Sequence, residues 1–271
     1  MKELTYGEAL MEAFFEEMRR DSKVFHICGN HGALAALIPE FGEPRVRACP
    51  ISEEAYVGAG IGAAGSGFRP IISPGMMTFA FTAMDQIVNQ MAKIHYMFGG
   101  QVKVPMGVRS IIGRSWGQGA QHSQALHALF MHIPGLKVVA PSNAHDAKGC
   151  MIVAIRDNNP VMYLWHKVLY DLEEEVPEGD WVVPLGEAAV RREGEDITVV
   201  AYSLMMHRAM EAAAELDGRV SVEIIDPRTL HPFDLDTVLV SLRKTGRLLV
   251  VHESPVRCGV GGDIVRRVCG A

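Results

Sequence analysis

The sequence lacks an excess of positive charge, an ordered set of cysteines and any long apolar run. Its 26 Lys and Arg are outnumbered by 32 Asp and Glu, giving a formal net charge of −6, whereas a nucleic-acid-binding protein is expected to be basic. The five cysteines are scattered and form no CxxC pair, which argues against a disulfide framework and a zinc site. No run of about 18 apolar residues and no apolar signal core occurs, so we expect a cytoplasmic protein that does not enter a membrane.

Short apolar runs alternate with helix-like segments along the chain. With 271 residues, of which 48% are hydrophobic, the chain is long enough for two α/β domains. The alternation predicts a mainly parallel sheet covered on both faces. The expected strands lie at residues 24–28, 45–51, 70–73, 102–108, 137–140 and 161–164, and the expected helices at 5–20, 56–67, 82–96 and 144–156. Thr5 to Glu8 has the pattern of a capping box at the start of the first helix.

An acid-rich stretch divides the chain. Residues 171–180 contain mostly Asp, Glu, Pro and Gly, which favours a solvated linker. We therefore expect a first domain at residues 1–170, a linker at 171–186 and a second, smaller α/β domain at 187–271. The second domain is expected to have strands at 197–201, 220–225 and 248–252 and helices at 208–216 and 235–242.

Gly60-Ile61-Gly62-Ala63-Ala64-Gly65 satisfies the GxGxxG pattern of dinucleotide-binding folds. That pattern should follow a strand directly, but Glu53, Glu54 and Ala55 intervene. We therefore favour a helix of small residues that lets a neighbouring segment approach closely. A nicotinamide-binding enzyme stays open as the less favoured alternative.

Two polar clusters are candidates for chemistry. Ser52-Glu53-Glu54 stands where a strand meets a helix, and a carboxylate there is either a simple cap or a functional group. Gln121-His122-Ser123 follows a glycine-rich loop, and a histidine in such a place is a candidate acid–base residue. His127 and His132 lie in an apolar stretch, so we interpret them as structural.

Several segments taken in order resemble the E1 β subunit of pyruvate, branched-chain and acetoin dehydrogenases. In the first half they are Pro50-Ile51-Ser52-Glu53, Met77-Thr78-Phe79-Ala80-Phe81, Ala120-Gln121-His122-Ser123-Gln124, Pro134-Gly135-Leu136-Lys137-Val138-Val139 and Ile155-Arg156-Asp157-Asn158-Asn159-Pro160. In the second half they are Asp226-Pro227-Arg228-Thr229-Leu230 and Lys244-Thr245-Gly246-Arg247. The resemblance covers nearly the whole chain. It implies a pyrimidine-binding domain of a thiamine-diphosphate enzyme followed by a transketolase C-terminal-like domain that is incomplete.

The resemblance also implies roles for individual residues. Glu53 matches the glutamate that bonds to N1′ of the aminopyrimidine and so promotes loss of the thiazolium C2 proton. Phe81 matches the aromatic ring that stacks on the pyrimidine, and His122 matches the active-site histidine that binds intermediates or guides acyl transfer to a lipoyl group. A potassium loop of mostly backbone oxygens is implied at Met106, Ala154, Asp157 and Asn159.

The family's motif for Mg²⁺ and the diphosphate begins GDG, and this sequence contains no GDG. The resemblance therefore implies that an E1 α subunit holds Mg²⁺ in an α₂β₂ heterotetramer. It also implies a 2-oxo substrate and a lipoyl-bearing E2 partner. The alternatives are the C-terminal half of a split transketolase-like enzyme that transfers a carbon unit to an aldehyde, and a non-catalytic subunit that keeps only the fold.

Three features depart from the family pattern. Gly29-Asn30-His31-Gly32 stands where relatives have an acidic GED-like turn, which puts the substrate-side contacts in doubt. Ser73-Pro74-Gly75-Met76 adds residues before Met77, so the match of Phe81 depends on the MTFxF pattern and not on its spacing from Glu53. The chain also ends sooner than its relatives, at Gly270-Ala271, either as a truncated piece or as a shortened variant.

Overall fold

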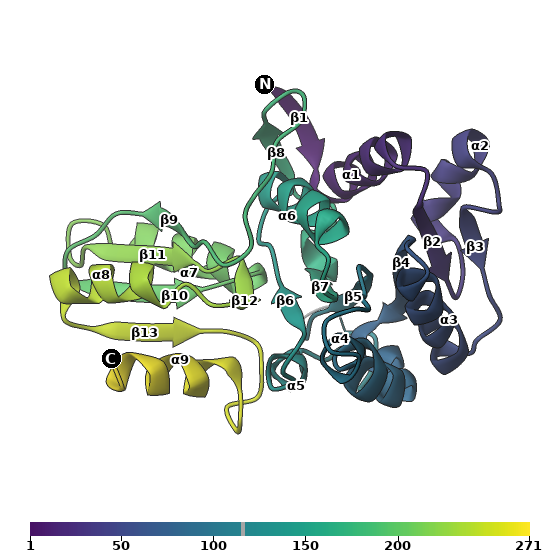
Figure 1. Cartoon of the computed structure of the whole chain (residues 1–271). Helices are drawn as coiled ribbons and strands as arrows, with labels where there is room; N and C mark the ends of the chain where they lie inside the picture. Colours follow the sequence, from purple (N-terminus) through teal and green to yellow (C-terminus); the bar gives the residue numbers. More distant parts are fainter. Residues whose placement is uncertain (115–116) are drawn as a thin grey trace.

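The computed structural model describes residues 1–114 and 117–271, which form two α/β units side by side (Figure 1). The larger unit contains a seven-stranded sheet and the smaller unit a four-stranded sheet. A two-stranded ribbon stands near the N-terminus. This arrangement confirms the expected α/β class, with a mainly parallel sheet and a smaller second unit.

The large sheet has the strand order β12-β6-β7-β5-β4-β2-β3, and every neighbouring pair except β12–β6 is parallel. Successive side chains of a strand point to opposite faces of the sheet. Adjacent Ile71 and Ile72 therefore lie in different hydrophobic cores, one on each face of the sheet. The strand bounds are β2 Val24–Cys28, β3 Val46–Ala48, β4 Arg69–Met76, β5 Gly107–Ile112, β6 Lys137–Val139, β7 Val161–His166 and β12 Thr229–His231.

Helices cover both faces of this sheet. Helices α1 (Tyr6–Arg20) and α6 (Ala144–Arg156) pack together over one face, and α3 (Glu53–Gly65) with the 3₁₀ helix η2 (Met77–Ala83) lies over the other. The predicted capping box is confirmed: the Thr5 hydroxyl accepts a bond from the Glu8 amide, and the Glu8 carboxylate accepts one from the Thr5 amide. The short helices of this unit are η1 Gly32–Leu37, α2 Ile38–Phe41, α5 Ala128–Met131 and η4 Lys167–Leu169.

Two sequence-based elements were wrong in their extent. The single helix expected at residues 82–96 is divided among the end of η2, a π-helical segment η3 (Gln86–Met91) and α4 (Ile94–Met97). The strand expected at 102–108 is instead β5, which begins at Gly107. Pro105 explains this shift, because proline has no N–H to donate within a sheet.

The acid-rich segment expected to be linker is partly a strand. Glu173–Val176 forms β8, which pairs antiparallel with β1 (Lys2–Thr5) to make the ribbon near the N-terminus. In β8 the exposure alternates, with Glu173 and Glu175 exposed and Val176 buried. Composition alone gave the wrong structure for this segment, because a strand with one solvent-exposed face tolerates repeated carboxylates.

The second unit has the strand order β13-β10-β11-β9, in which only β9 is antiparallel. Apolar strands such as β10 (ITVVA) form its centre. The bounds are β9 Ala189–Arg192, β10 Ile197–Ala201, β11 Val222–Asp226, β13 Leu248–Val251, α7 Leu204–Glu215, α8 Leu235–Thr245 and α9 Val260–Cys269.

The two units are joined through polar side chains and a shared strand. Strand β12 comes from the second half of the chain yet pairs with β6 at the edge of the first sheet. Arg191 contacts the fully buried carboxylates of Asp146 and Asp226, one from each unit. The boundary between the units is therefore a packed interface with buried charge.

Within residues 1–114 and 117–271, no helix is both long enough and apolar enough to cross a membrane. All five cysteines are free thiols, and three of them are wholly or partly buried.

Candidate active site

Glu53 is the first residue of α3, at the carboxyl-end edge of the large sheet. Its side chain is 9% exposed and accepts one long hydrogen bond, 3.5 Å from the Thr82 hydroxyl to Oε2. Among the described residues no cation pairs with it. Glu53 lines an open hollow of about 610 Å³ with Ser52, Glu54, Ala55, Gly58, Thr82 and Gln86. A buried carboxylate with free lone pairs can therefore accept a hydrogen bond from a molecule in this hollow.

Tyr56 lies three residues after Glu53 on the same face of α3. Its hydroxyl is buried and has no hydrogen-bond partner among the described residues. Burial, and secondly the carboxylate of Glu53, raise the pKa of Tyr56 above its usual range, so it stays a neutral phenol. The sequence analysis missed this residue, although its spacing from Glu53 on a helix is a usable signal.

The structure brings His122 together with Phe79, not with Phe81. The rings of Phe79 and His122 meet edge-to-face with centroids 5.3 Å apart. Phe81 packs against Phe130 in the core, with ring centroids 6.4 Å apart. In a 3₁₀ helix, residues two positions apart point in different directions, so only one of these two rings can face His122.

A hydrogen bond of 2.5 Å from the Thr78 hydroxyl to the carbonyl of Gln121 joins η2 to the loop that carries His122. Residues 115–116 of the glycine-rich loop lie outside the described residues. His127 is buried, with Nε2 2.6 Å from the Tyr202 hydroxyl and 2.9 Å from the Ser254 hydroxyl. Burial lowers the pKa of His127 to about 3. The structural interpretation of His127 is therefore confirmed.

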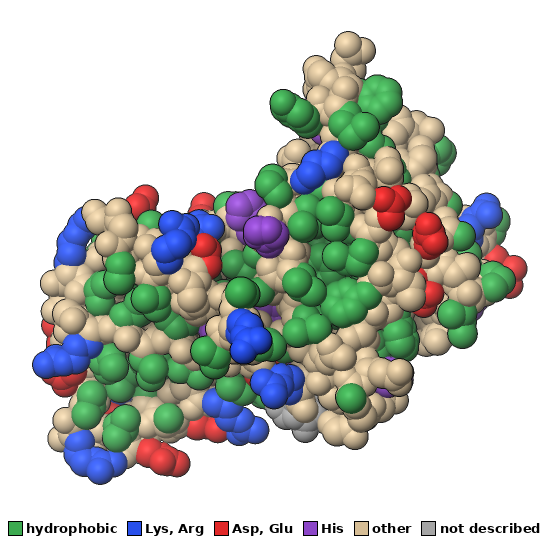
Figure 2. Space-filling model, turned by 90° about the horizontal axis from the view of Figure 1, so that it is seen from below, with side chains coloured by type: hydrophobic (Ala, Val, Ile, Leu, Met, Phe, Trp, Pro, Cys, Tyr) green, Lys and Arg blue, Asp and Glu red, His purple; other side chains and the backbone are tan. Residues whose placement is uncertain are grey.

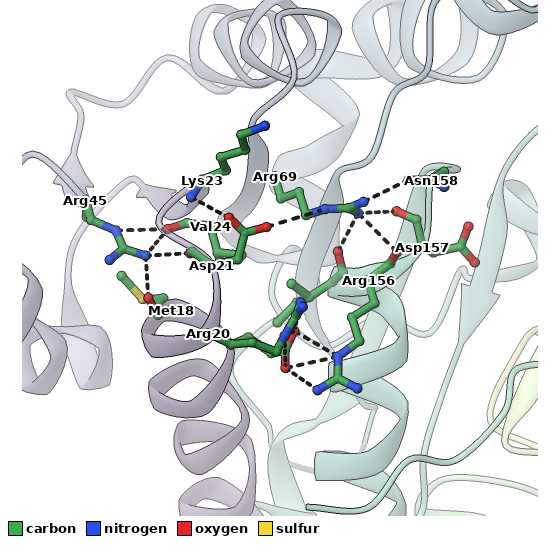
Figure 3. A network of polar contacts seen from close by, with 12 residues as sticks. Met18, Arg20, Asp21, Lys23, Val24, Arg45, Arg69, Arg156, Asp157 and Asn158 are labelled. Carbon is green, nitrogen blue, oxygen red and sulfur yellow. Dashed lines mark hydrogen bonds and ion pairs between the residues drawn. The ribbon is translucent and has the colours of Figure 1, made fainter.

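The turn expected to be a potassium loop is held by the protein's own cations (Figure 3). The Arg69 guanidinium donates to the carbonyls of Ile155, Arg156 and Asp157 and to Oδ1 of Asn158, at 2.8–3.1 Å. The carboxylate of Asp157 pairs with Lys137.

Burial acts to raise the pKa of Asp157, but hydrogen bonds from Lys137 and Asn159 outweigh it and lower the value. The carbonyl of Met106 accepts a bond from the amide of Val161, and Ala154 is buried in α6. Potassium at Met106, Ala154, Asp157 and Asn159 stays a prediction.

The glycines of the GxGxxG pattern lie inside α3 and not at a turn between strand and helix. A Cβ at Gly60 would stand 2.7 Å from Cδ1 of Ile72, so this glycine allows the close approach of α3 to β4. The arrangement fits helix packing and not a dinucleotide site.

Two family models together match nearly the whole chain. The model described as the pyrimidine binding domain of transketolase matches residues 2–172, and the model described as the C-terminal domain of transketolase matches residues 186–270. The β subunit of acetoin:2,6-dichlorophenolindophenol oxidoreductase from Cupriavidus necator is 46% identical, covering 98% of this chain and 84% of its own. The β subunit of the pyruvate dehydrogenase E1 component from Rickettsia bellii is 43% identical, covering 97% and 83%.

Solved structures agree on the fold. A split-gene transketolase, described as an inactive β₄ tetramer, superposes with a TM-score of 0.84 over 98% of this chain and 85% of its own, at 23% identity. A transketolase from Leishmania mexicana gives 0.69 at 15% identity, over 99% of this chain and 44% of its own. With the fold, the two matched domains and these relatives taken together, the chain belongs to the transketolase-like family, among the E1 β subunits of thiamine-diphosphate-dependent 2-oxoacid and acetoin dehydrogenases.

Proposed function

We propose that this chain is the β half of a thiamine-diphosphate site that cleaves a 2-oxo acid or acetoin and that is complete only with an α-type subunit. The observation that carries this proposal is the buried carboxylate of Glu53, which faces an open hollow with unused acceptor capacity. When bound, thiamine diphosphate supplies the nucleophilic carbon and the electron sink for cleavage beside the 2-oxo group.

Glu53 fits the pyrimidine end of this cofactor. A carboxylate at a helix N-terminus is stabilised as an anion by the helix dipole, and among the described residues no cation pairs with Glu53, whose hydrogen bond from Thr82 is long at 3.5 Å. Its task is to accept a hydrogen bond at a carboxylate oxygen and to hold a proton there during the reaction. Buried, neutral Tyr56 keeps the inner side of this carboxylate dry.

We propose Phe81 for the stacking role on the pyrimidine ring, as the sequence pattern suggested. Phe81 is half-buried and directly precedes Thr82, which lines the hollow of Glu53, whereas Phe79 is half-buried beside His122 and lines a different cavity. His122 is partly exposed on the same edge and can donate or accept a proton at the substrate side. We propose that this histidine also guides transfer of the acyl group to a lipoyl carrier on an E2 partner.

Exposed apolar side chains support a partner subunit. Figure 2 shows apolar side chains gathered over the middle of the face seen from below. Large apolar side chains exposed on this chain include Ile51 at 89%, Tyr96 at 88% and Val256 at 94%. Ile51 lies two residues before Glu53, so a partner that covers it would also close the hollow. Such exposure is typical of a protein–protein contact, and we propose an α₂β₂ heterotetramer.

The same proposal extends to two metal ions, Mg²⁺ and potassium. We propose that Mg²⁺ is held by the α subunit together with the diphosphate. Within residues 1–114 and 117–271, no group of three or more His, Cys, Asp and Glu side chains gathers as a metal site. We propose potassium as a structural ion at Met106, Ala154, Asp157 and Asn159, held mostly by backbone oxygens.

The test is calorimetric titration of thiamine diphosphate with Mg²⁺ into the chain alone and into its mixture with an α-type subunit. Binding only in the mixture, followed by turnover of a 2-oxo acid or acetoin, is the expected result. Glu53→Gln removes the anionic acceptor and should lower turnover by about a hundredfold or more, on the scale of a lost acid–base group. Glu175→Gln, which changes an exposed carboxylate on β8, is the matched control and should leave turnover unchanged.

No cofactor binding in the mixture would contradict the half-site. Full turnover by Glu53→Gln would contradict the role of Glu53 while leaving the half-site intact. Phe81→Ala should weaken cofactor binding in the mixture, whereas Phe79→Ala, which removes the ring beside His122 and outside the hollow of Glu53, should weaken it less.

A further inference from the structure

A second cavity, of about 440 Å³, opens at the carboxyl-end edge of the large sheet, where β2, β4, β5 and β7 end. It contains both segments that depart from the family pattern, namely residues 29–32 and 73–76. Its polar lining includes Asn30, His31, Ser73, Arg109 and Lys167. None of the described residues that line it is Asp or Glu, so the charge of the lining is positive.

Arg109 is the unusual member of this lining. It is only partly exposed, it makes no hydrogen bond and no ion pair with any described residue, and its Nε is buried without a partner. Its guanidinium carbon lies 4.7 Å from the Trp165 ring centroid and 5.6 Å from the Phe14 ring centroid. The two rings fix the position of the guanidinium and leave its charge without a counter-ion.

Burial lowers the pKa of Arg109, and the side chains that oppose this effect, Tyr170, Tyr163, Tyr6 and Cys28, include no carboxylate. An arginine still remains charged in proteins. A buried charge without a partner is unfavourable, and a planar guanidinium is suited to bind a carboxylate through two parallel hydrogen bonds. Arg109 therefore has both the geometry and the energetic reason to take an anion from solution.

Other unpaired donors stand around it. Ser73 and Trp165 are 8% and 4% exposed, and the hydroxyl of the first and the indole N–H of the second have no hydrogen-bond partner among the described residues. Both line the cavity. Lys167 also lines it, and its ammonium lies 5.0 Å from the Tyr170 ring centroid. The ring nitrogen of His31 is 3.1 Å from the carbonyl of Val46 and donates to it.

We propose that this cavity is a binding site for a small organic carboxylate, whose carboxylate group pairs with Arg109. The rest of the lining is apolar and includes Leu34, Met76, Phe79 and Ile111. A volume of about 440 Å³ holds a small acid with an aliphatic group. The ligand is therefore an acid with a short apolar tail and not inorganic phosphate or a nucleotide.

Phe79 joins this cavity to the edge that carries His122. The carboxylate can thus come from the substrate of the proposed reaction or from a separate small acid. The inference does not depend on the proposed function, because it concerns binding by this chain without cofactor or partner. Failure of either proposal leaves the other standing.

The experiment is calorimetric titration of the full chain with butanoate, butanamide and 2-oxobutanoate. Butanoate should bind and raise the melting temperature, whereas the neutral, isosteric butanamide should not. Equal affinities for butanoate and 2-oxobutanoate would support a site for carboxylates in general. Tighter binding of 2-oxobutanoate would support the substrate as the natural ligand.

Two variants test the assignment to Arg109. Arg109→Met keeps an apolar side chain without the charge. It should lower the affinity for butanoate by about tenfold or more, the loss expected for a charge-assisted pair. Trp165→Glu places a carboxylate beside Arg109 and should abolish binding by competing with the ligand. Trp165→Gln, its neutral match, should retain more affinity than Trp165→Glu.

Circular dichroism establishes that each variant is folded before its affinity is compared. The amide comparison is made on the unchanged chain, so the proposal stays testable even if a variant does not fold. It would be overturned if butanoate failed to bind, if butanoate and butanamide bound equally, or if folded Arg109→Met bound butanoate as tightly as the parent.

Discussion

His26 makes the stability of this chain dependent on pH in a way that one substitution should remove. It lies in the middle of β2, fully buried, with its ring edge-on to Phe14 at 4.6 Å between centroids. Neither ring nitrogen has a hydrogen-bond partner among the described residues. Burial, with smaller contributions from Arg109 and Arg45, lowers the pKa of His26 from 6.5 to about 3.

The direction of the pH dependence follows from the lowered pKa of His26. The folded chain holds His26 neutral, so the stability from this group is fully present above pH 6.5 and is lost as the pH falls towards 3. At pH 5 the unfolded chain gains a proton that the folded chain does not bind. The difference of about 1.5 pH units corresponds to about 2 kcal/mol of lost stability between pH 7 and pH 5.

His26→Leu removes the titrating ring and should recover that loss. The free energies of unfolding are measured by urea titration at pH 7 and pH 5 for the parent and the variant. The stability of the variant relative to the parent should rise by about 2 kcal/mol between the two pH values. Phe25→Leu changes the same strand without changing a titratable group. Its free energy of unfolding should differ from that of the parent by the same amount at pH 7 and at pH 5. An unchanged difference for His26→Leu would refute the buried, neutral histidine.

Four further substitutions test the packing of the fold by thermal and urea unfolding. Thr5→Ala removes the capping box of α1 and should cost about 1 kcal/mol, and no change would contradict the cap. Gly60→Ala forces a methyl group to 2.7 Å from Ile72 and should destabilise by about 1–3 kcal/mol. Gly62→Ala meets no atom within 4 Å and should stabilise by about 0.5–1 kcal/mol, so equal effects at the two glycines would contradict the packing of α3. Arg191→Met removes the cation that two buried carboxylates share, so that Asp226 loses its ion pair while Asp146 keeps Arg228 and His145, and should cost roughly 3–5 kcal/mol; a change below 1 kcal/mol would contradict that network.

Two of the mispredicted regions have different physical causes. Residues 82–96 have helical spacing of apolar side chains, but this spacing is too coarse to distinguish α, 3₁₀ and π turns, which differ in the hydrogen-bond partner and only slightly in the number of residues per turn. Residues 173–176 have the acidic composition of a linker. They nevertheless form β8, because they pair antiparallel with β1, which is far away in the sequence. A pairing across that many residues leaves no local signal in either segment.

Part of the candidate site could be predicted from neighbouring residues in the sequence, and part could be seen only in the folded structure. Glu53 was found because a carboxylate beside a strand–helix junction stands out in the sequence and its neighbours resemble a known family. Phe81 was assigned to the pyrimidine because it matches the MTFxF pattern of the family, and that assignment stays a prediction. Only the direction of each ring, set by η2 against the core, distinguished the one beside His122 from the one beside Phe130.

The sequence by itself determined the family, the two α/β units, the helix start at Thr5 and the position of Glu53, because each depends on residues close together in the chain. The tertiary structure alone decided that β12 crosses to the first sheet, that Phe79 meets His122, and that Arg109 stands without a counter-ion beside a cavity. These three features depend on strands that are far apart in sequence and adjacent in space. Their side chains acquire partners, or remain without them, only when the sheet has formed.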